Sequence, residues 1–233
     1  MIAENIKILR GRIAEISIKA KRDPADIKII AVSKNFGIDE IAEASKEGLL
    51  DFGENKAQEL DSKFAQLGNK VTWHFLGHLQ RNKVRFAVNS ADYIHSVDSL
   101  MIAMDINNRA EKINKVQKIL LQVKTSNEET KSGLTDDSEI MDIAWYCKEL
   151  KNVELKGLMT IGPLTDDREE IRRSFRYMSN LKNTLKEDGL HLKELSMGMT
   201  SDYDIAIEEG ATMLRIGTAI FGERNYSNIM DEQ

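Results

Sequence analysis

The feature that most constrains the fold is a regular alternation between short apolar runs and amphipathic segments. Runs rich in β-branched residues, such as 27–34 and 118–124, are typical of buried strands. Between the runs, apolar residues recur at steps of three and four, as Ile2, Ile6 and Leu9 do, which is the spacing of one helix face. Strands that alternate with helices form parallel sheets. The sequence therefore predicts an α/β protein.

The pattern predicts a strand at each of the residue ranges 27–34, 49–55, 72–78, 93–97, 118–124, 155–161, 194–200 and 213–219. Eight such units in 233 residues fit a closed (β/α)8, or TIM, barrel. An open, doubly wound sheet is the alternative, but no Gly-x-Gly-x-x-Gly turn follows the first strand. With two prolines and no linker-like stretch, residues 1–233 are expected to form a single domain with an N-terminal helix and a short polar C-terminal tail.

Composition narrows the classes of function. A net charge of −5 argues against a dedicated nucleic-acid-binding protein. No apolar stretch approaches the length of a transmembrane helix, and the N-terminus lacks a secretory signal pattern, so no membrane partner is expected. The single cysteine, Cys147, fits a reducing compartment, and we expect a cytoplasmic protein.

A lysine stands where the first predicted strand ends. In a barrel of this kind, function lies at the carboxyl ends of the strands. Lys34 at such an end would lose part of its hydration, which lowers the pKa of an ammonium group and provides an amine that can form an imine. A lysine that only marks the boundary between strand and solvent is the alternative.

The last two strand ends have the composition of a phosphate site. Thr200 and Ser201 directly precede a predicted helix, whose free N–H groups and dipole favour an anion. Gly217 and Thr218 end the last strand, and barrels commonly hold phosphate at the loops after strands seven and eight. A simple helix cap at Ser201 and a simple bend at Gly217 are the alternatives. An amine near a phosphate site suits a phosphorylated aldehyde held as an imine, and pyridoxal 5′-phosphate is such a molecule.

Longer motifs extend this reading. They are AVSK at 31–34, FGEN at 52–55, WHFLGHLQ at 73–80, KSG at 131–133, GLM at 157–159, LSMGM at 195–199 and RIGTAIFG at 215–222. Over nearly the whole chain they resemble the YggS/PROSC family, the pyridoxal phosphate homeostasis proteins. The resemblance implies a type III pyridoxal-phosphate-binding barrel, similar to the N-terminal domain of bacterial alanine racemase, and a role in controlling intracellular vitamin B6.

The resemblance also implies the cofactor-binding residues, which are Lys34, Asn55, Ser196, Met197, Thr200, Ser201, Arg215, Gly217 and Thr218. Lys34 would carry pyridoxal phosphate as an internal aldimine, and the four residues at 200–201 and 217–218 would hold the phosphate. Asn55 would lie beside the ring, with Ser196 and Met197 lining the pocket. Arg215 would face the pyridine nitrogen and keep it unprotonated, which weakens the cofactor as an electron sink.

Two positions depart from the usual family pattern. Residues 35–37 are Asn-Phe-Gly where the family more often has a threonine and a proline nearby, so the shape of the loop after Lys34 is left open. Thr200 stands where serine is common, and it keeps the hydroxyl.

Three further groups compete for a chemical role. Lys124 also ends a predicted strand and could form an imine, but it lacks the surrounding motif. Lys131, in a Ser/Gly loop, could cover the site or be an ordinary exposed lysine. His74 and His78 are expected on one strand face, but no partner at ligand spacing accompanies them, so no metal site is predicted.

The leading hypothesis is a pyridoxal phosphate carrier and homeostasis protein with no dedicated catalytic residues. Racemisation needs an acid/base group on each face of the substrate. The resembling racemases take the second group, a tyrosine, from an added β-domain and a dimer partner, whereas this sequence ends soon after its eighth strand. A monomer is therefore expected, with pyridoxal-phosphate-dependent apo-enzymes as candidate recipients. The alternatives are a pyridoxal-phosphate-dependent amino-acid racemase and a cofactor-free aldolase that uses Lys34 or Lys124.

Overall fold

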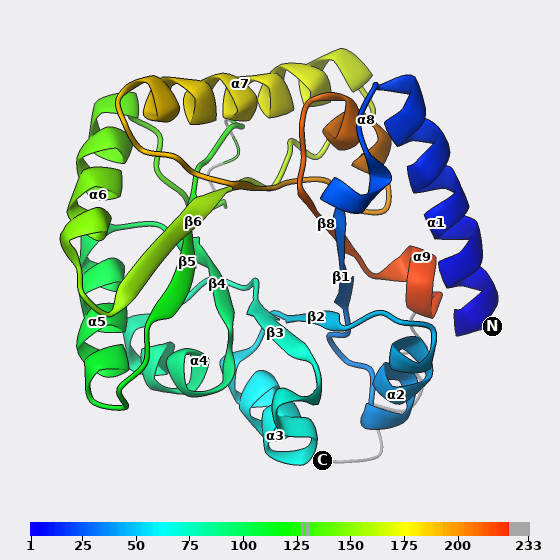
Figure 1. Ribbon diagram of the computed structural model, residues 1–233, viewed down its shortest axis with the longest axis horizontal. Helices are drawn as coiled ribbons and strands as arrows, with labels where there is room; N and C mark the ends of the chain where they lie inside the picture. Colours follow the sequence, from blue (N-terminus) through cyan, green and yellow to red (C-terminus); the bar gives the residue numbers. More distant parts are fainter. Residues whose placement is uncertain (127, 129–130, 224–233) are drawn as a thin grey trace.

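A computed structural model describes residues 1–126, 128 and 131–223 of the chain, and it is a closed parallel barrel (Figure 1). The strands follow one another around the barrel in sequence order, and the last strand pairs with the first. They are β1 (Lys28–Val32), β2 (Asp51–Glu54), β3 (Thr72–Phe75), β4 (Tyr93–Val97), β5 (Gln117–Gln122), β6 (Val153–Met159), β7 (Glu194–Ser196) and β8 (Met213–Ile216). The predicted (β/α)8 barrel is confirmed.

Helices surround the barrel on the outside (Figure 1). They are α1 (Ile2–Lys19), α2 (Ile38–Lys46), α3 (Ala57–Leu67), α4 (Val84–Ser90), α5 (Leu100–Glu111), α6 (Asp137–Glu149), α7 (Arg168–Glu187), α8 (Tyr203–Glu208) and α9 (Thr218–Phe221), with short 3-10 turns at Pro24–Asp26, Gly68–Lys70 and Arg81–Lys83. Within the described residues, no helix combines the length and the apolar character needed to cross a membrane. The predicted polar tail falls almost entirely at residues 224–233, outside the described part of the chain.

Several strands end earlier than the sequence predicts. β1 ends at Val32, so Lys34 lies in the loop that follows rather than on the strand. β7 ends at Ser196, because Gly198 adopts a φ of 93°, which no extended strand has, and Thr200 is therefore also a loop residue. Lys34 and Thr200 thus both lie on loops that follow the carboxyl ends of strands.

One helix start differs from prediction: the helix expected directly after Thr200 begins only at Tyr203. At the start of α6, the side chain of Asp136 accepts the hydrogen bond from the Glu139 N–H at 2.9 Å and caps the helix. Cys147 is buried on α6, beside the apolar residues that this helix turns toward the core.

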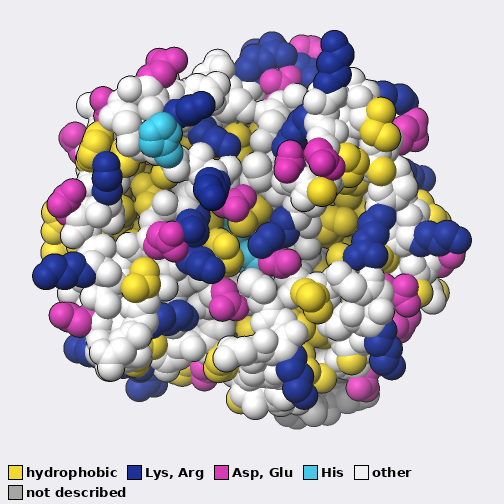
Figure 2. Space-filling model, in the orientation of Figure 1, with side chains coloured by type: hydrophobic (Ala, Val, Ile, Leu, Met, Phe, Trp, Pro, Cys, Tyr) yellow, Lys and Arg dark blue, Asp and Glu magenta, His cyan; other side chains and the backbone are white. Residues whose placement is uncertain are grey.

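The inside of the barrel is only partly apolar. Its apolar cluster consists of Ile30, Leu76, Tyr93, Leu120, Met159 and Met213. Four polar side chains share the interior and are also buried: His74, His95, Ser196 and Arg215. Because buried polar groups are stable only when they are hydrogen-bonded, these residues indicate an organised polar network. On the outer surface, cationic and anionic side chains are interspersed over the face shown in Figure 2.

Candidate functional site

A cavity of about 430 Å³ opens above the carboxyl ends of β1, β2, β7 and β8. This volume lies in the range of roughly 300–1,000 Å³ that small-molecule sites occupy. Its described lining is Val32, Lys34, Phe36, Asn55, Leu76, Ile161, Met199, Thr200, Ser201, Arg215, Gly217, Thr218 and Gly222. Residues from opposite ends of the sequence therefore meet at this cavity because β1 and β8 are neighbours in the barrel.

Most of the predicted site residues line this cavity, namely Lys34, Asn55, Thr200, Ser201, Arg215, Gly217 and Thr218. Ser196 and Met197, which were expected to line the pocket, are not among the residues that line this cavity. Successive side chains of a strand point to opposite faces. Ser196 accordingly contacts the barrel interior, and Met197 belongs to the apolar core that packs the helices on the sheet.

The loop that carries Lys34 is held on both sides by a group of charged residues, termed the Lys63 cluster, which consists of Glu54, Glu59 and Lys63. Lys63 Nζ donates to the carbonyl oxygen of Ser33 at 2.8 Å and pairs with both carboxylates. The Ser33 hydroxyl donates to Glu54 Oε1 at 2.6 Å, and the Asn35 N–H donates to Glu59 Oε1 at 2.8 Å. The two chain neighbours of Lys34 are thus tied to one buried cluster.

Glu54 is the most strongly perturbed member of the Lys63 cluster. Its side chain has no exposed surface, and burial raises the pKa of its carboxyl group to about 7, although the Lys63 ammonium and the Ser33 hydroxyl act in the opposite direction. Within the described residues its Oε2 atom is buried and has no hydrogen-bond partner. Glu54 therefore changes its charge near neutral pH, directly behind the loop of Lys34.

Arg215 brings a buried cation to the cavity. Its Nη1 donates to Ser196 Oγ and its Nη2 to the Thr160 carbonyl oxygen, each at 2.7 Å. Burial lowers the pKa of the guanidinium to about 10, and the nearby Asp202 carboxylate opposes this. The group stays cationic at neutral pH, in an orientation fixed by two hydrogen bonds.

The loop between β7 and α8 presents hydroxyl groups to the same cavity. Asp202 Oδ1 accepts a hydrogen bond of 2.6 Å from the Met199 N–H, which closes a tight turn around Thr200 and Ser201. Gly217, directly after β8, and Thr218, the first residue of α9, line the cavity from the neighbouring side. Residues with hydroxyl groups and a guanidinium thus share one lining, and these hydrogen-bond donors suit an anion.

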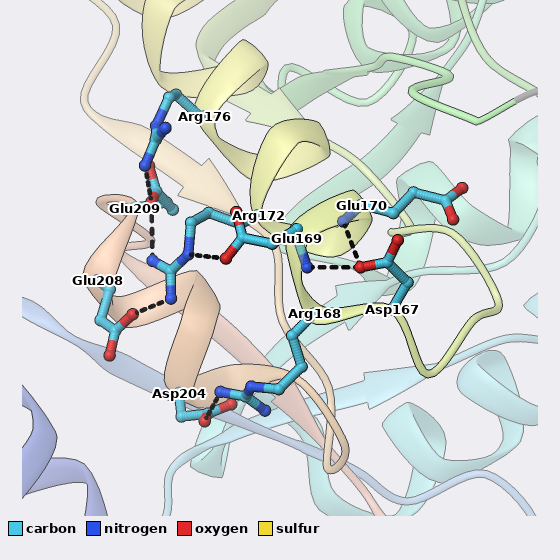
Figure 3. Close-up of polar contacts among 9 residues, drawn as sticks. All are labelled: Asp167, Arg168, Glu169, Glu170, Arg172, Arg176, Asp204, Glu208 and Glu209. Atoms are coloured by element: carbon cyan, nitrogen blue, oxygen red, sulfur yellow. Dashed lines mark hydrogen bonds and ion pairs between the residues drawn. The ribbon is translucent and has the colours of Figure 1, made fainter.

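The short helix α8 is held from outside by α7 (Figure 3). Three arginines of α7 pair with three carboxylates at or next to α8: Arg168 with Asp204 at 2.6 Å, Arg172 with Glu208 at 2.6 Å and with Glu209 at 3.0 Å, and Arg176 with Glu209 at 2.9 Å. Asp167 caps the first turn of α7 by accepting from two backbone N–H groups. Exposed pairs are weak singly, but Arg172 and Arg176 share Glu209, and together the pairs hold α8 against α7, directly after the loop of Thr200 and Ser201.

The loop after Lys34, whose shape the sequence left open, contains a left-handed residue and an aromatic anchor. Asn35 has a φ of 66°, a conformation that asparagine tolerates better than most residues. Phe36 lines the cavity and stacks on Phe221, with ring centroids 4.7 Å apart. The stack joins the start of α2 to α9 at the cavity rim.

The competing groups lie elsewhere. Lys124 lines a different pocket, beside Asp136 and Tyr177. Lys131 Nζ donates to the Gly162 carbonyl oxygen at 2.7 Å and does not line the cavity of Lys34.

The two histidines considered as metal ligands do not share a strand face. β3 ends at Phe75, so His78 lies in the following loop, while His74 is buried inside the barrel. Among the described residues, no group of three or more His, Cys, Asp or Glu side chains is placed to hold a metal ion.

Comparison with known proteins identifies the family. The family model for the alanine racemase N-terminal domain matches residues 2–225. A pyridoxal phosphate homeostasis protein of Vibrio alginolyticus is 38% identical over 231 residues, which cover 97% of this chain and 99% of the relative. The chain belongs to the pyridoxal phosphate homeostasis protein family. The family resemblance inferred from the motifs is confirmed.

Solved structures agree with this family. PipY of Synechococcus elongatus PCC7942 matches both without pyridoxal phosphate, at a TM-score of 0.86 and 38% identity, and with it bound, at 0.84 and 37%. Each match covers 95% of this chain and 100% of PipY. An alanine racemase of Clostridium difficile 630 matches at a TM-score of 0.71 but only 17% identity, which shows the barrel fold alone.

The sequence motifs did not indicate the residues that do not line the cavity but contact partners or chain neighbours of the residues that do, such as Lys63 and His95. Lys63 lies on α3, and nothing in its helical spacing distinguishes it from a surface lysine. His95 offered a better signal, since a polar side chain stands in the middle of the apolar strand β4. A polar residue at an inward position of a barrel strand predicts a buried hydrogen-bond network.

Proposed function

We propose that this protein binds pyridoxal 5′-phosphate in the cavity at the carboxyl ends of β1, β2, β7 and β8, attached covalently through Lys34. In this proposal it serves the intracellular homeostasis of the cofactor and has no dedicated catalytic turnover. The observation that carries the proposal is the convergence of one amine, one buried guanidinium and several hydroxyls on a single cavity. The names of its relatives and the bound state of PipY support the same cofactor.

The lining residues fit the chemical groups of this cofactor. Lys34 supplies the amine for the aldehyde carbon, and the phosphate would be held by the Thr200 and Ser201 hydroxyls and by the backbone at 217–218. Asn55 would flank the ring. When bound, pyridoxal phosphate supplies an electrophilic carbon and an electron-withdrawing ring. In this proposal Ser196 and Met197 support the site from behind rather than touch the ring.

Arg215 favours binding over turnover. A guanidinium donates hydrogen bonds and cannot accept them. Facing Arg215, the ring nitrogen would have to act as the acceptor and stay unprotonated, and a neutral ring withdraws electrons less strongly. A buried, oriented arginine therefore supports a carrier more than an enzyme of amino-acid chemistry.

The rest of the lining argues against a racemase. Only Lys34 and Arg215 carry ionisable side chains among the described residues that line the cavity. Racemisation needs an acid/base group on each face of the substrate carbon. No second such group stands beside Lys34 in this lining, which supports a cofactor-binding role.

The proposal includes three finer statements. The protein acts in the cytoplasm, which is consistent with its single, reduced cysteine. It works as a monomer, because the proposed site draws all its residues from one chain. It passes the cofactor to pyridoxal-phosphate-dependent apo-enzymes. Light scattering of the loaded protein and reactivation of a separate apo-enzyme test the last two statements.

The test of the function compares wild type with Lys34→Ala and Lys124→Ala, each incubated with pyridoxal phosphate and then reduced with borohydride. We expect an imine absorption band in wild type and in Lys124→Ala but not in Lys34→Ala, and a reduced pyridoxyl group on the peptide that contains Lys34. A wild-type protein that takes up no cofactor would refute the proposal. Rapid exchange of the α-proton of an added amino acid with D2O would refute the absence of turnover.

A further inference from the structure

A chain of hydrogen bonds crosses the barrel interior beneath the cavity. Arg215 Nη1 lies 2.7 Å from Ser196 Oγ, and this oxygen lies 3.0 Å from His95 Nδ1. His95 Nε2 lies 2.9 Å from His74 Nδ1, and His74 Nε2 lies 2.9 Å from Asp51 Oδ1. These five residues, termed the interior chain, come from β8, β7, β4, β3 and β2.

The two ends of the interior chain fix the direction of its hydrogen bonds. At one end the guanidinium of Arg215 can only donate, so Ser196 Oγ accepts from it and has its own proton left to give. At the other end an ionised carboxylate, Asp51, can only accept. When both imidazoles are neutral, the three polar groups between these ends all donate in the same direction, from Ser196 toward Asp51.

The positions of the imidazole protons follow from this direction. The Ser196 hydroxyl donates to Nδ1 of His95, which must then be unprotonated and carry its proton on Nε2. That proton is donated to Nδ1 of His74, whose own proton lies on Nε2 and is donated to Asp51. With both imidazoles neutral, this arrangement satisfies every link of the interior chain.

The surroundings also favour neutral imidazoles. Both side chains are fully buried, and burial lowers the pKa of His74 and of His95, the latter further because of His74, Arg215 and Lys28. The His74 ring stacks on Tyr93 at 4.8 Å with an interplanar angle of 9°, which fixes the plane in which its nitrogens point.

The far end of the interior chain reaches the amino ends of the strands. Asp51 is partly exposed there and pairs with Lys28 Nζ at 3.2 Å. Burial raises the pKa of Asp51, but the hydrogen bond from His74 and the Lys28 ammonium outweigh this and keep the pKa below its ordinary value. Figure 2 shows histidine atoms at the centre of one face, between cationic and anionic side chains.

We infer that His95 and His74 are positioning residues: His95 accepts the Ser196 proton, which holds the Ser196 oxygen in place as the acceptor for Arg215 and thereby orients the guanidinium toward the cavity. This role rests on the proposed function, in which Arg215 faces the ring nitrogen of the cofactor. The second guanidinium bond, to the Thr160 carbonyl oxygen, fixes the remaining rotation. His74 and His95 would thus orient Arg215 although neither of them lines the cavity.

Two serine-to-alanine variants of this protein can be compared directly. Ser196→Ala removes the central hydroxyl of the interior chain. Ser96→Ala removes another fully buried hydroxyl, one with no hydrogen-bond partner among the described residues. Both variants lose the same atom from a buried strand, so a difference between them reports on the interior chain and not on burial alone.

The experiment records long-range ¹H–¹⁵N spectra of the histidine rings and of the Arg215 side chain at neutral pH, before any cofactor is added. We expect His74 and His95 to be neutral with the proton on Nε2, and their signals and those of Arg215 to shift in Ser196→Ala but not in Ser96→Ala. In the loaded protein we expect Ser196→Ala alone to move the absorption band and to release cofactor about tenfold faster, the effect of one bond to a charged group.

A proton on Nδ1 of His95, a charged His95, or Arg215 signals that are unchanged in Ser196→Ala would overturn the inference. An unchanged band and release rate in the loaded Ser196→Ala variant would overturn the positioning role. The spectra without cofactor decide the hydrogen-bond direction by themselves. If wild type takes up no cofactor, the proposed function is refuted, but the hydrogen-bond direction measured without cofactor still holds.

Discussion

The buried carboxyl group of Glu54 predicts an unusual dependence of stability on pH, which Glu54→Gln should abolish. The pKa of this carboxyl is about 7 in the folded protein, against 4.5 for an ordinary glutamate. The folded state therefore binds more protons than the unfolded state between these two values. Through this group, stability falls as pH rises from about 4.5 to about 7 and then levels off.

The size of the effect follows from the two pKa values. A difference of one pKa unit corresponds to about 1.4 kcal/mol, so Glu54 costs about 3 kcal/mol of stability between about pH 4.5 and about pH 8. Glutamine has the same shape, stays neutral and can accept from Lys63 and Ser33 as Glu54 Oε1 does. The variant should match wild type at the acid end and be the more stable protein by about 3 kcal/mol at the alkaline end.

Urea unfolding of both proteins at several pH values measures this difference. Other titrating groups, including the two buried histidines, change both proteins alike and cancel when the free energies of unfolding are subtracted. Asp39→Asn, on the exposed first turn of α2, is the control and should show no such trend. A difference between Glu54→Gln and wild type that stays constant with pH would refute the reasoning.

Three other changes have expected outcomes of their own. Lys63→Met leaves the Glu54 carboxyl buried without its cation and should cost about 3–5 kcal/mol in urea unfolding at alkaline pH; the same change should cost much less in the Glu54→Gln background, and a double variant whose change equals the sum of the two single changes would contradict the pairing. A methyl group at Gly77 would lie 2.0 Å from the Asn55 carbonyl oxygen, so Gly77→Ala should destabilise by about 1–3 kcal/mol. Gly11→Ala, with open space around it in α1, should stabilise by up to about 1 kcal/mol, and equal effects would count against the packing argument. Burial raises the pKa of the Cys147 thiol to about 12, so alkylation should proceed only as fast as unfolding, and rapid labelling in native buffer would contradict this.

The fold was predictable because the barrel repeats one simple pattern. Most strands contain several apolar residues, and helices with one apolar stripe alternate with them, so the repeated pattern predicts the architecture. The strand ends were less predictable. Met197 and Met199 continue an apolar pattern beyond β7, and only the backbone shows that Gly198 there, like Asn35 after β1, has left the extended region.

Of the candidate site, the residues that line the cavity were predictable from the sequence, but the residues behind them were not. Residues at strand ends, such as Lys34 and Thr218, have neighbours that the topology alone brings together. Ser196 is not among the residues that line the cavity, because strand alternation turns it into the barrel interior, where it contacts Arg215. The Lys63 cluster and the interior chain join residues far apart in sequence, and no local pattern shows which polar groups meet inside a barrel.

The closure of the barrel by β1 and β8 sets the order of events during synthesis. Lys34 leaves the ribosome early, but the loops that carry Thr200 and Thr218 follow only near the end of translation. Until then β1 can pair with β2 alone, and its other edge stays open. Pairings between such distant segments form late in folding. In the proposed site, a nascent chain would therefore have the Lys34 amine without the residues that hold the anion, and the cofactor would be loaded only after the barrel is complete.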